Sequence, residues 1–477
     1  MKLPALILLP ALAAAAGPSL EIQSVIDLAQ GAPPEIAADA LIRIAALDQL
    51  PKERRMDLLE QAFGLAPFAP QPYKRRSALA RAIGPAGFLN RVYEQDLDTL
   101  SLQLRAIEGL LPLAPQKARQ LFLGIAPVIL PQLSCDDFLV YDIDRFYAVL
   151  ERVAAQTFSA KEVREEEPAK FLVGYLASVG SAAQVAGAAR LVAGSAGTDA
   201  EFQSLVTSFA GALGRISSDS RSFLYGANAA AADIQKLAEQ SQRRRMSPQV
   251  VLEAYRQFLA NHLAGAPCAD NGKVVWSATA AGVATYFNDH LAIPPLPPID
   301  VSALSPPTTD GELKGLKWCE DSECRSIHEQ YQTLVLGQAG AFKQNREREQ
   351  TEWQSKARDF LDSMAGWTQS TGLTPVEYFR EKIAMFSEFL IVVPNGPTRE
   401  FVLQSMLAFL RQTQLPPENR PEWVLPISQL AGRVRLSPAD WNQTADDLRR
   451  ANDSVIALAM ALEAVAPRSL SALMPVL

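Results

Sequence analysis

The chain has 477 residues, of which 48% are hydrophobic and 20% charged, so it can bury more than one core of ordinary size. Its formal net charge of −7 argues against a dedicated nucleic-acid surface, because such surfaces are basic. The composition also excludes a disordered chain and a bundle of membrane-spanning helices.

The first residues, MKLPALILLPALAAAAG, have the pattern of a secretory signal peptide. Lys2 supplies the positive charge, residues 3–12 form a short apolar core, and residues 13–16 are the small side chains typical of a cleavage site. The apolar core is shorter than the ~20 residues of a membrane-spanning helix. We therefore expect residues 1–17 to be a signal peptide and the protein to be periplasmic or secreted, with no membrane insertion after cleavage.

The rest of the chain predicts α-helices. Apolar residues recur at helical spacing, for example at Phe379, Ile383 and Phe386. Residues 198–201 and 374–377 have the capping-box sequence with which helices begin. Strand candidates are limited to residues 273–277 and 389–393, and both can also be helix ends or loops. The fold class predicted is all-α.

Two segments of the N-terminal half, residues 40–63 and 102–125, are similar to each other. Arg43 of the first segment corresponds to Arg105 of the second, and each segment reads as a helix, a proline turn and a second helix. Units of this kind bury their apolar faces by stacking. We therefore expect stacked helical hairpins in a solenoid-like arrangement.

A proline-rich stretch, IPPLPPIDVSALSPPTT, follows residue 292 and is unsuited to a helix, because proline lacks the N–H donor. It predicts two lobes. The expected organisation is an N-terminal helical-hairpin lobe over residues 18–265, a proline-rich linker or excursion over 266–316, and a C-terminal helical lobe over 317–477.

Four cysteines are present, at Cys135, Cys268, Cys319 and Cys324. In an oxidising compartment an even number of cysteines indicates disulfides. The favoured pairing is Cys135 with Cys268 and Cys319 with Cys324. The alternative joins Cys268 to Cys319 or Cys324, and leaves Cys135 with the remaining cysteine.

Cys319 and Cys324 lie in the stretch KWCEDSECRSIHEQY, which also contains His328. Cys324 and His328 are four residues apart, so on a helix they share a face and could bind one metal ion or form a thiol–imidazole pair. The spacing C-x4-C-x3-H matches no standard zinc pattern, and the acidic residues suit a helix start. We therefore favour a disulfide at a helix start, with the metal site of Cys319, Cys324 and His328 as the alternative.

Signatures of the common catalytic sites are absent. The chain contains no G-x-S-x-G, S-x-x-K or H-E-x-x-H sequence and no phosphate-binding loop, and its three histidines are His262, His290 and His328. The sequence therefore predicts no catalytic residue and no cofactor.

Three charged runs have local explanations. The basic runs at residues 74–76 and 243–245 read as exposed helix faces, with anion binding as the alternative. Asp136, Asp137, Asp142 and Asp144 read as an exposed helix start. A calcium loop is the alternative, but the glycine that such a loop needs is missing.

The stretches PPEIAADALIRIA (33–45), CDDFLVYDIDRFY (135–147) and PCADNGK (267–273) resemble a group of exported all-helical bacterial proteins. The resemblance covers about residues 33–273 and implies a signal peptide and a helical body. It implies no activity, so it assigns no functional residue.

These observations favour a non-enzymatic module that binds a protein or peptide partner on a helical surface, since stacked hairpins commonly do so. Two other functions stay open at this point. One is an extracytoplasmic enzyme with its site between the lobes, and the other is the small metal-binding module at Cys319, Cys324 and His328.

Overall fold

The protein is all-α, as the sequence predicts. The computed structural model describes residues 22–77, 85–134, 137–216, 220–263, 282–300, 319–343, 347–394, 396–413 and 415–433, with Leu458 and Leu462. Up to residue 156 the elements are α1 (Ile22–Gln30), α2 (Pro34–Ala45), α3 (Lys52–Leu65), η1 (Ala66–Phe68), β1 (Arg75–Ser77), α4 (Pro85–Tyr93), α5 (Thr99–Leu110), α6 (Pro115–Leu123), β2 (Leu139–Tyr141) and α7 (Asp144–Gln156).

Helices continue to the end of the described chain. From residue 160 to 291 they are α8 (Ala160–Arg164), α9 (Glu167–Ala177), η2 (Ala182–Gln184), α10 (Val185–Gly194), α11 (Asp199–Leu213), α12 (Ser220–Arg243), α13 (Gln249–Leu263) and the π-helical turn η3 (Phe287–Leu291). After residue 319 they are α15 (Ser322–Lys343), α16 (Glu347–Gly366), α17 (Pro375–Val392), α18 (Pro397–Gln412), η5 (Pro417–Asn419) and α19 (Arg420–Arg433).

Both capping boxes expected from the sequence form. The Thr198 side chain accepts a hydrogen bond from the Glu201 N–H at the start of α11, and Thr374 does the same for Glu377 at the start of α17. In each box the glutamate accepts in return from the threonine N–H. Two of the N–H groups that a helix start leaves without a partner are thereby satisfied.

The two strands lie where the sequence analysis did not place them. β1 and β2 pair antiparallel, with Arg76 opposite Val140. Of the two strand candidates, residues 389–393 are the helix end that was the alternative, because Phe389 to Val392 continue α17; residues 273–277 lie outside the described chain. The cause is long-range pairing: each strand has only three residues, and its partner lies more than 60 residues away in the chain.

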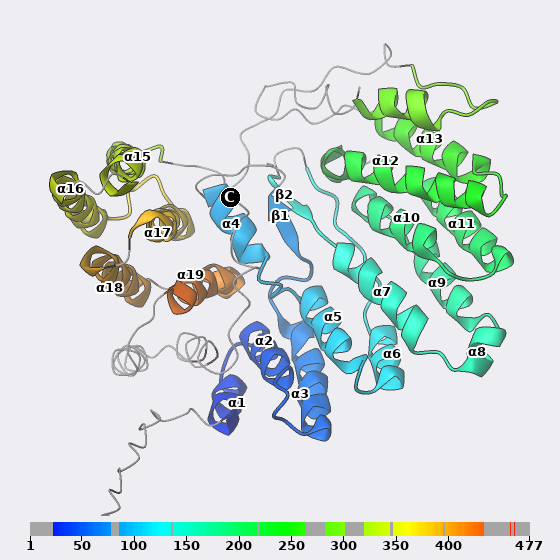
Figure 1. Ribbon diagram of the computed structural model, residues 1–477, viewed down its shortest axis with the longest axis horizontal. Coiled ribbons are helices and arrows are strands. Elements are labelled where there is room, and N and C mark those ends of the chain that lie inside the picture. Colours follow the sequence, from blue (N-terminus) through cyan, green and yellow to red (C-terminus); the bar gives the residue numbers. More distant parts are fainter. Residues whose placement is uncertain are drawn as a thin grey trace, which may run out of the picture.

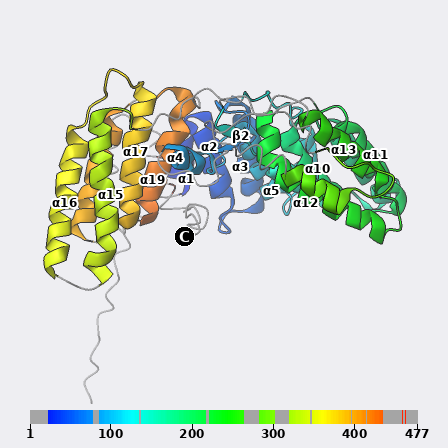
Figure 2. The same ribbon diagram turned by 90° about the horizontal axis from the view of Figure 1, so that it is seen from above.

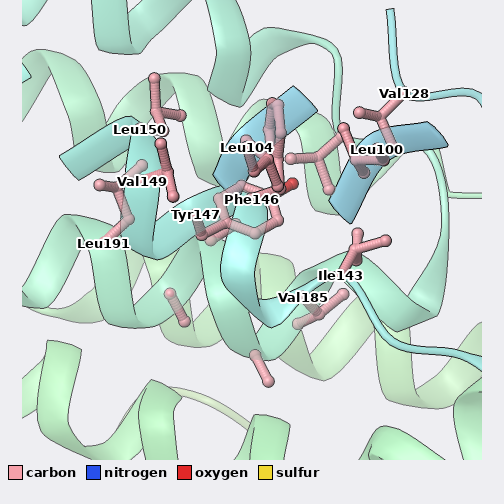
Figure 3. Packing of buried hydrophobic residues seen from close by; sticks show 14 of the residues in the cluster. Leu100, Leu104, Val128, Ile143, Phe146, Tyr147, Val149, Leu150, Val185 and Leu191 are labelled. Atoms are coloured by element: carbon pink, nitrogen blue, oxygen red, sulfur yellow. The ribbon is translucent and has the colours of Figure 1, made fainter. Parts of the chain in front are cut away.

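Most of the buried apolar side chains between residues 22 and 299 form one hydrophobic cluster. Figure 3 shows part of it, where Phe146, Tyr147 and Leu150 of α7 lie among side chains of α5 and α10. The similar segments at 40–63 and 102–125 both contribute, and each forms the two helices expected of it, the end of α2 with α3 and α5 with α6.

The C-terminal helices form a second cluster, which includes a helix from the N-terminal half. α15 to α19 pack around Phe360, Phe379 and Phe389, and α4 adds Phe88 and Leu89 to this core. Figure 1 shows α4 beside α17 and α19, with α15, α16 and α18 beyond them and α8 to α13 at the opposite end of the molecule. Viewed at right angles, the molecule is elongated along the same axis (Figure 2).

Part of the segment expected to be a linker is helical and buried. Val283, Phe287 and Leu291 recur every four residues, and all three side chains are buried in the first cluster. This part of residues 266–316 therefore continues the N-terminal packing, although prolines follow directly after it.

The solenoid-like stacking and the division into two lobes stay predictions, as do the signal peptide and its cleavage. Residues 1–17 lie outside the described chain. Among the described helices, none combines the length and the apolar character needed to cross a bilayer.

Candidate functional site

The structure contains one of the two disulfides of the favoured pairing. Cys319 and Cys324 are joined at the start of α15, with their Cα atoms 4.8 Å apart. Cys135 and Cys268 lie outside the described residues, so their pairing stays a prediction. The backbone φ of Cys319 is +48°, in the left-handed region that residues other than glycine seldom adopt.

His328 does not complete a metal site with the two cysteines. Its ring nitrogen Nε2 lies 2.9 Å from Nε2 of Gln332, and its ring stacks on that of Tyr331. The cysteine sulfurs are bonded to each other, so neither can act as a thiolate ligand or nucleophile in this state. The neighbours of the disulfide are carboxylates instead.

Two carboxylates border the disulfide, and we call Cys319, Cys324, Asp321 and Glu381 the disulfide cluster. Glu381, on α17, is fully buried, and its Oε1 accepts a hydrogen bond of 3.0 Å from the Cys319 N–H. Asp321 precedes α15, and its Oδ1 accepts one of 2.8 Å from the Cys324 N–H. One oxygen of each carboxylate and the Cys324 sulfur lie within 4.8 Å of one another.

Burial dominates the electrostatics of this part of α17. It raises the pKa of Glu381 to about 7, against the opposing effect of the Cys319 N–H. It lowers the pKa of the neighbouring Lys382 to about 8. The Lys382 Nζ donates to the Trp367 carbonyl and to the Tyr378 hydroxyl, which replaces part of its lost hydration.

A second site lies in the N-terminal half, and we call it the arginine pocket. It has a volume of about 290 Å³. α2, α3, α5 and α7 contribute its walls, together with the turns after α2 and α5. It is lined by Ile42, Ala45, Ala46, Arg55, Leu59, Arg105, Glu108, Gly109, Pro112 and Arg145.

Gly109 permits the close packing of α3 and α5 at this pocket. A Cβ atom at Gly109 would lie 2.9 Å from Cδ2 of Leu59, closer than real Cβ atoms approach another heavy atom. The missing side chain lets α5 approach α3. Arg105 and Glu108 of α5 consequently face the same space as Arg55 of α3.

Carboxylates shared between cations hold the arginines in place. Asp39 accepts from Arg105 at 2.6 Å and also pairs with Arg43, so the two arginines at equivalent positions of the similar segments bind the same acid. Glu108 accepts from Arg145 at 2.7 Å and from Arg152 at 2.9 Å.

Further ion pairs extend from the pocket arginines. Asp96 pairs with Arg145 and Lys74, and Asp142 pairs with Lys74 and Arg76. The carboxylate of Glu94 also interacts with Lys74 and Arg76. Arg105 and Arg145 are therefore held by carboxylates of this protein.

Among the cations that line the pocket, Arg55 has the weakest ion pair. Its Nε donates to the carbonyl of Ala45 at 2.8 Å, and its nearest carboxylate in the ion-pair network is that of Asp48, 3.7 Å away and fully exposed to solvent. An exposed pair at this distance is weak, because water screens it. Arg55 can therefore offer its charge to a ligand.

One charged run and part of another were misassigned from the sequence, for one shared reason. Residues 74–76 were expected on a helix face, and Asp142 at an exposed helix start; Asp144 of the same run does begin α7, with its side chain 53% exposed. In the structure residues 75–77 form β1, Asp142 follows β2 with its side chain 8% exposed, and it binds Arg76. The strand pairing brings the runs together. Arg76 and Asp142 neutralise each other across it, a contact that neither run reveals alone.

The remaining histidines do not gather into a catalytic site. His262 is buried in α13, where its Nδ1 lies 2.9 Å from the Phe258 carbonyl and its ring stacks on Phe223. His290 is exposed, against the ring of Tyr286. Neither lines the arginine pocket.

Asp98 gives the arginine-pocket region a predictable pH dependence. It caps α5 by accepting from the Ser101 N–H at 2.9 Å, and burial raises its pKa to about 6, against the effect of this hydrogen bond. The folded state therefore holds the proton more tightly than the unfolded state does. The contribution of Asp98 to the free energy of unfolding should be largest below about pH 4. It should fall by up to about 3 kcal/mol as the pH rises from about 4 through 6.

Asp98→Asn keeps an oxygen to cap the helix and removes the ionisation. The free energy of unfolding of the variant, relative to that of the wild type, should therefore be higher at about pH 7 than at about pH 4. Urea unfolding at both pH values measures it. A difference that is the same at both values would show that folding does not raise the pKa of Asp98.

No protein-family model, no curated protein and no solved structure matches this chain. The resemblance to exported all-helical bacterial proteins accordingly stays a prediction. Functional inference rests on the chain's own geometry.

Proposed function

We propose that the protein is an exported, non-enzymatic binding module, and that it takes an acidic side chain or a terminal carboxylate of a peptide or protein partner into the arginine pocket. The observation that carries the proposal is the convergence of Arg55, Arg105 and Arg145 on one cavity, where the ion-pair partner of Arg55 is the exposed Asp48, 3.7 Å away. A carboxylate bound there would give the Arg55 guanidinium a closer counter-charge.

The size of the pocket supports a side-chain-sized ligand. Its volume of about 290 Å³ is at the lower end of the range of about 300–1,000 Å³ for pockets that enclose drug-sized molecules. Ile42, Leu59 and Pro112 add apolar wall beside the guanidinium groups. This combination suits a carboxylate carried on a short aliphatic stem, as in a glutamate or a chain terminus.

Export is supported by the signal-peptide pattern of residues 1–17 and by the disulfide between Cys319 and Cys324, since disulfides persist in oxidising compartments. An enzyme with a site between the two clusters has less support. The described residues that connect α2 and the turn after α4 to α19 form structural contacts, such as Glu35 with Arg420 and Gln95 with the Pro421 carbonyl.

The test compares two neighbouring arginines of α3. Arg55 lines the pocket, whereas Arg54 does not and donates weakly to Gln23 at 3.5 Å. Binding is measured on an immobilised array of peptides that contain Glu and Asp. We expect Arg55→Gln to weaken this binding about tenfold, which is the cost of losing one charge-assisted hydrogen bond. Arg54→Gln should leave binding within about twofold, because exposed charges contribute little.

Both variants carry the same change in net charge, so nonspecific attraction would weaken equally in each. Circular dichroism of both variants tests whether their helix content is unchanged. Either of two results would overturn the proposed function. One is equal weakening by the two substitutions, and the other is equally tight binding of peptides that have Gln and Asn in place of Glu and Asp.

A further inference from the structure

The disulfide cluster contains more polar groups than a cross-link needs. Glu381 is completely buried, and its Oε2 has no hydrogen-bond partner among the described residues. The Asp321 Oδ2 is buried and without a partner in the same way. Each carboxylate therefore uses one oxygen to accept from a cysteine N–H and leaves the other unused.

A buried carboxylate oxygen without a partner is unfavourable, because the group loses its hydration and gains no hydrogen bond in return. Native proteins seldom keep such a group unless it has a ligand or a chemical role. Here two of them border the same pair of sulfur atoms. They come from different elements, the chain before α15 and the middle of α17.

These four side chains supply the ligand atoms that zinc prefers. Zinc binds cysteine thiolates and carboxylates with four ligands in a tetrahedron. Two thiolates also disfavour calcium and magnesium, which select oxygen ligands. One oxygen each of Asp321 and Glu381 already lies within 4.8 Å of the Cys324 sulfur, and Cys319 is bonded to Cys324.

The surroundings can carry the negative charge of such a site. The cluster lies at the first turn of α15, where the helix dipole stabilises negative charge. The Cys319 and Cys324 N–H groups hold the two carboxylates in place, which is the role of outer ligands in known zinc sites.

We propose that reduction converts the disulfide cluster into a zinc site with the ligands Cys319, Cys324, Asp321 and Glu381. In the reaction a dithiol reductant breaks the sulfur–sulfur bond, giving two cysteine thiols and the oxidised, cyclic disulfide of the reductant. Zinc then replaces the proton of each thiol, and two protons pass to the solvent. Disulfide and zinc exclude each other at this site.

The inference goes beyond the proposed binding function and does not depend on it. Its ligand set differs from the one considered from the sequence, since Asp321 and Glu381 take the place of His328.

The test uses the full chain, reduced anaerobically with a phosphine that does not bind metal, and titrated with zinc and with cobalt. We expect reduced wild-type protein to bind one more zinc ion per chain than oxidised protein. Cobalt should give the intense ultraviolet thiolate-to-metal band and the visible bands of tetrahedral coordination. Reduced protein that gains no metal, or cobalt without a thiolate band, would overturn the proposal.

Three variants assign the ligands. Cys319→Ser/Cys324→Ser retains Cys135 and Cys268 and should lose the additional metal, which excludes the other two cysteines as its source. Glu381→Gln keeps the acceptor for the Cys319 N–H and should weaken zinc binding at least about tenfold. Glu320→Gln makes the same charge change at an exposed neighbour and should leave affinity within about twofold.

Equal weakening by Glu381→Gln and Glu320→Gln would remove Glu381 from the ligand set and contradict the proposed site. The cobalt spectrum of the wild type needs no variant, so it decides the matter even where a substituted chain fails to fold.

Discussion

Asp39→Ala should destabilise the protein by about 3–5 kcal/mol, the cost of removing one partner from a buried ion pair. The Asp39 side chain is 5% exposed and is shared by Arg105, at 2.6 Å, and Arg43. Without it, two guanidinium groups with side chains only 14% and 11% exposed lose their common counter-charge. Urea-induced unfolding, followed by circular dichroism, measures the loss.

Asp48→Ala is the matched control, because it also removes an acid that faces an arginine of the pocket. The Asp48 side chain is fully exposed and lies 3.7 Å from Arg55, so its removal should change stability by less than about 0.5 kcal/mol. Similar losses of stability in the two variants would contradict the view that Asp39 stabilises the fold because its ion pairs are buried.

Glu422→Ala should cost about 3–5 kcal/mol for the same physical reason, at the other end of the molecule. Glu422, on α19, is 2% exposed and binds Arg380 of α17 through two hydrogen bonds of 2.7 and 2.8 Å. It also accepts from the Asn419 side chain. The substitution leaves the Arg380 charge without this partner, and urea unfolding again measures the result.

Removing both partners separates the cost of an unpaired charge from the contribution of the pair. Arg380→Met/Glu422→Leu replaces the ion pair by apolar side chains, and should recover most of the stability lost in Glu422→Ala. A double variant no more stable than the single one would show that the ion pair itself, rather than the stranded arginine, accounts for the loss.

Local sequence signals predicted the helices well. The capping boxes at residues 198–201 and 374–377 begin α11 and α17, because a cap depends only on side chains within one turn. The similar segments at 40–63 and 102–125 form helix pairs for the same reason. β1 and β2 escaped prediction, since each has three residues and acquires its conformation from a distant partner.

The candidate sites depend on contacts that sequence spacing cannot supply. Cys319 and Cys324 were recognisable as a local pair, but Glu381 lies 57 positions after Cys324 in the sequence and was missed. A signal was present: Arg380, Glu381 and Lys382 interrupt a helix that is otherwise apolar on one side, between Phe379 and Ile383. Three successive charges in a buried helix need partners elsewhere.

The sequence contained only one indication of the arginine pocket. The equivalence of Arg43 and Arg105 marked two positions of one structural unit, yet their shared acid, Asp39, precedes the first similar segment by one residue. Arg55 and Arg145 join them only through the packing of α3 and α7 against α5. The convergence of these arginines is a property of that packing and has no signature in any single run.

The most direct measurement of the central claim is calorimetric titration of the wild-type protein with a matched pair of peptides. Both peptides have the sequence of the tightest binder on the array, one with its glutamates and its free carboxyl terminus, the other with glutamines and a terminal amide. We expect binding of the acidic peptide only, weakening as salt is raised. Two results would contradict a carboxylate site in the arginine pocket. The two peptides could bind equally tightly, or Arg55→Gln could leave the binding of the acidic peptide unchanged.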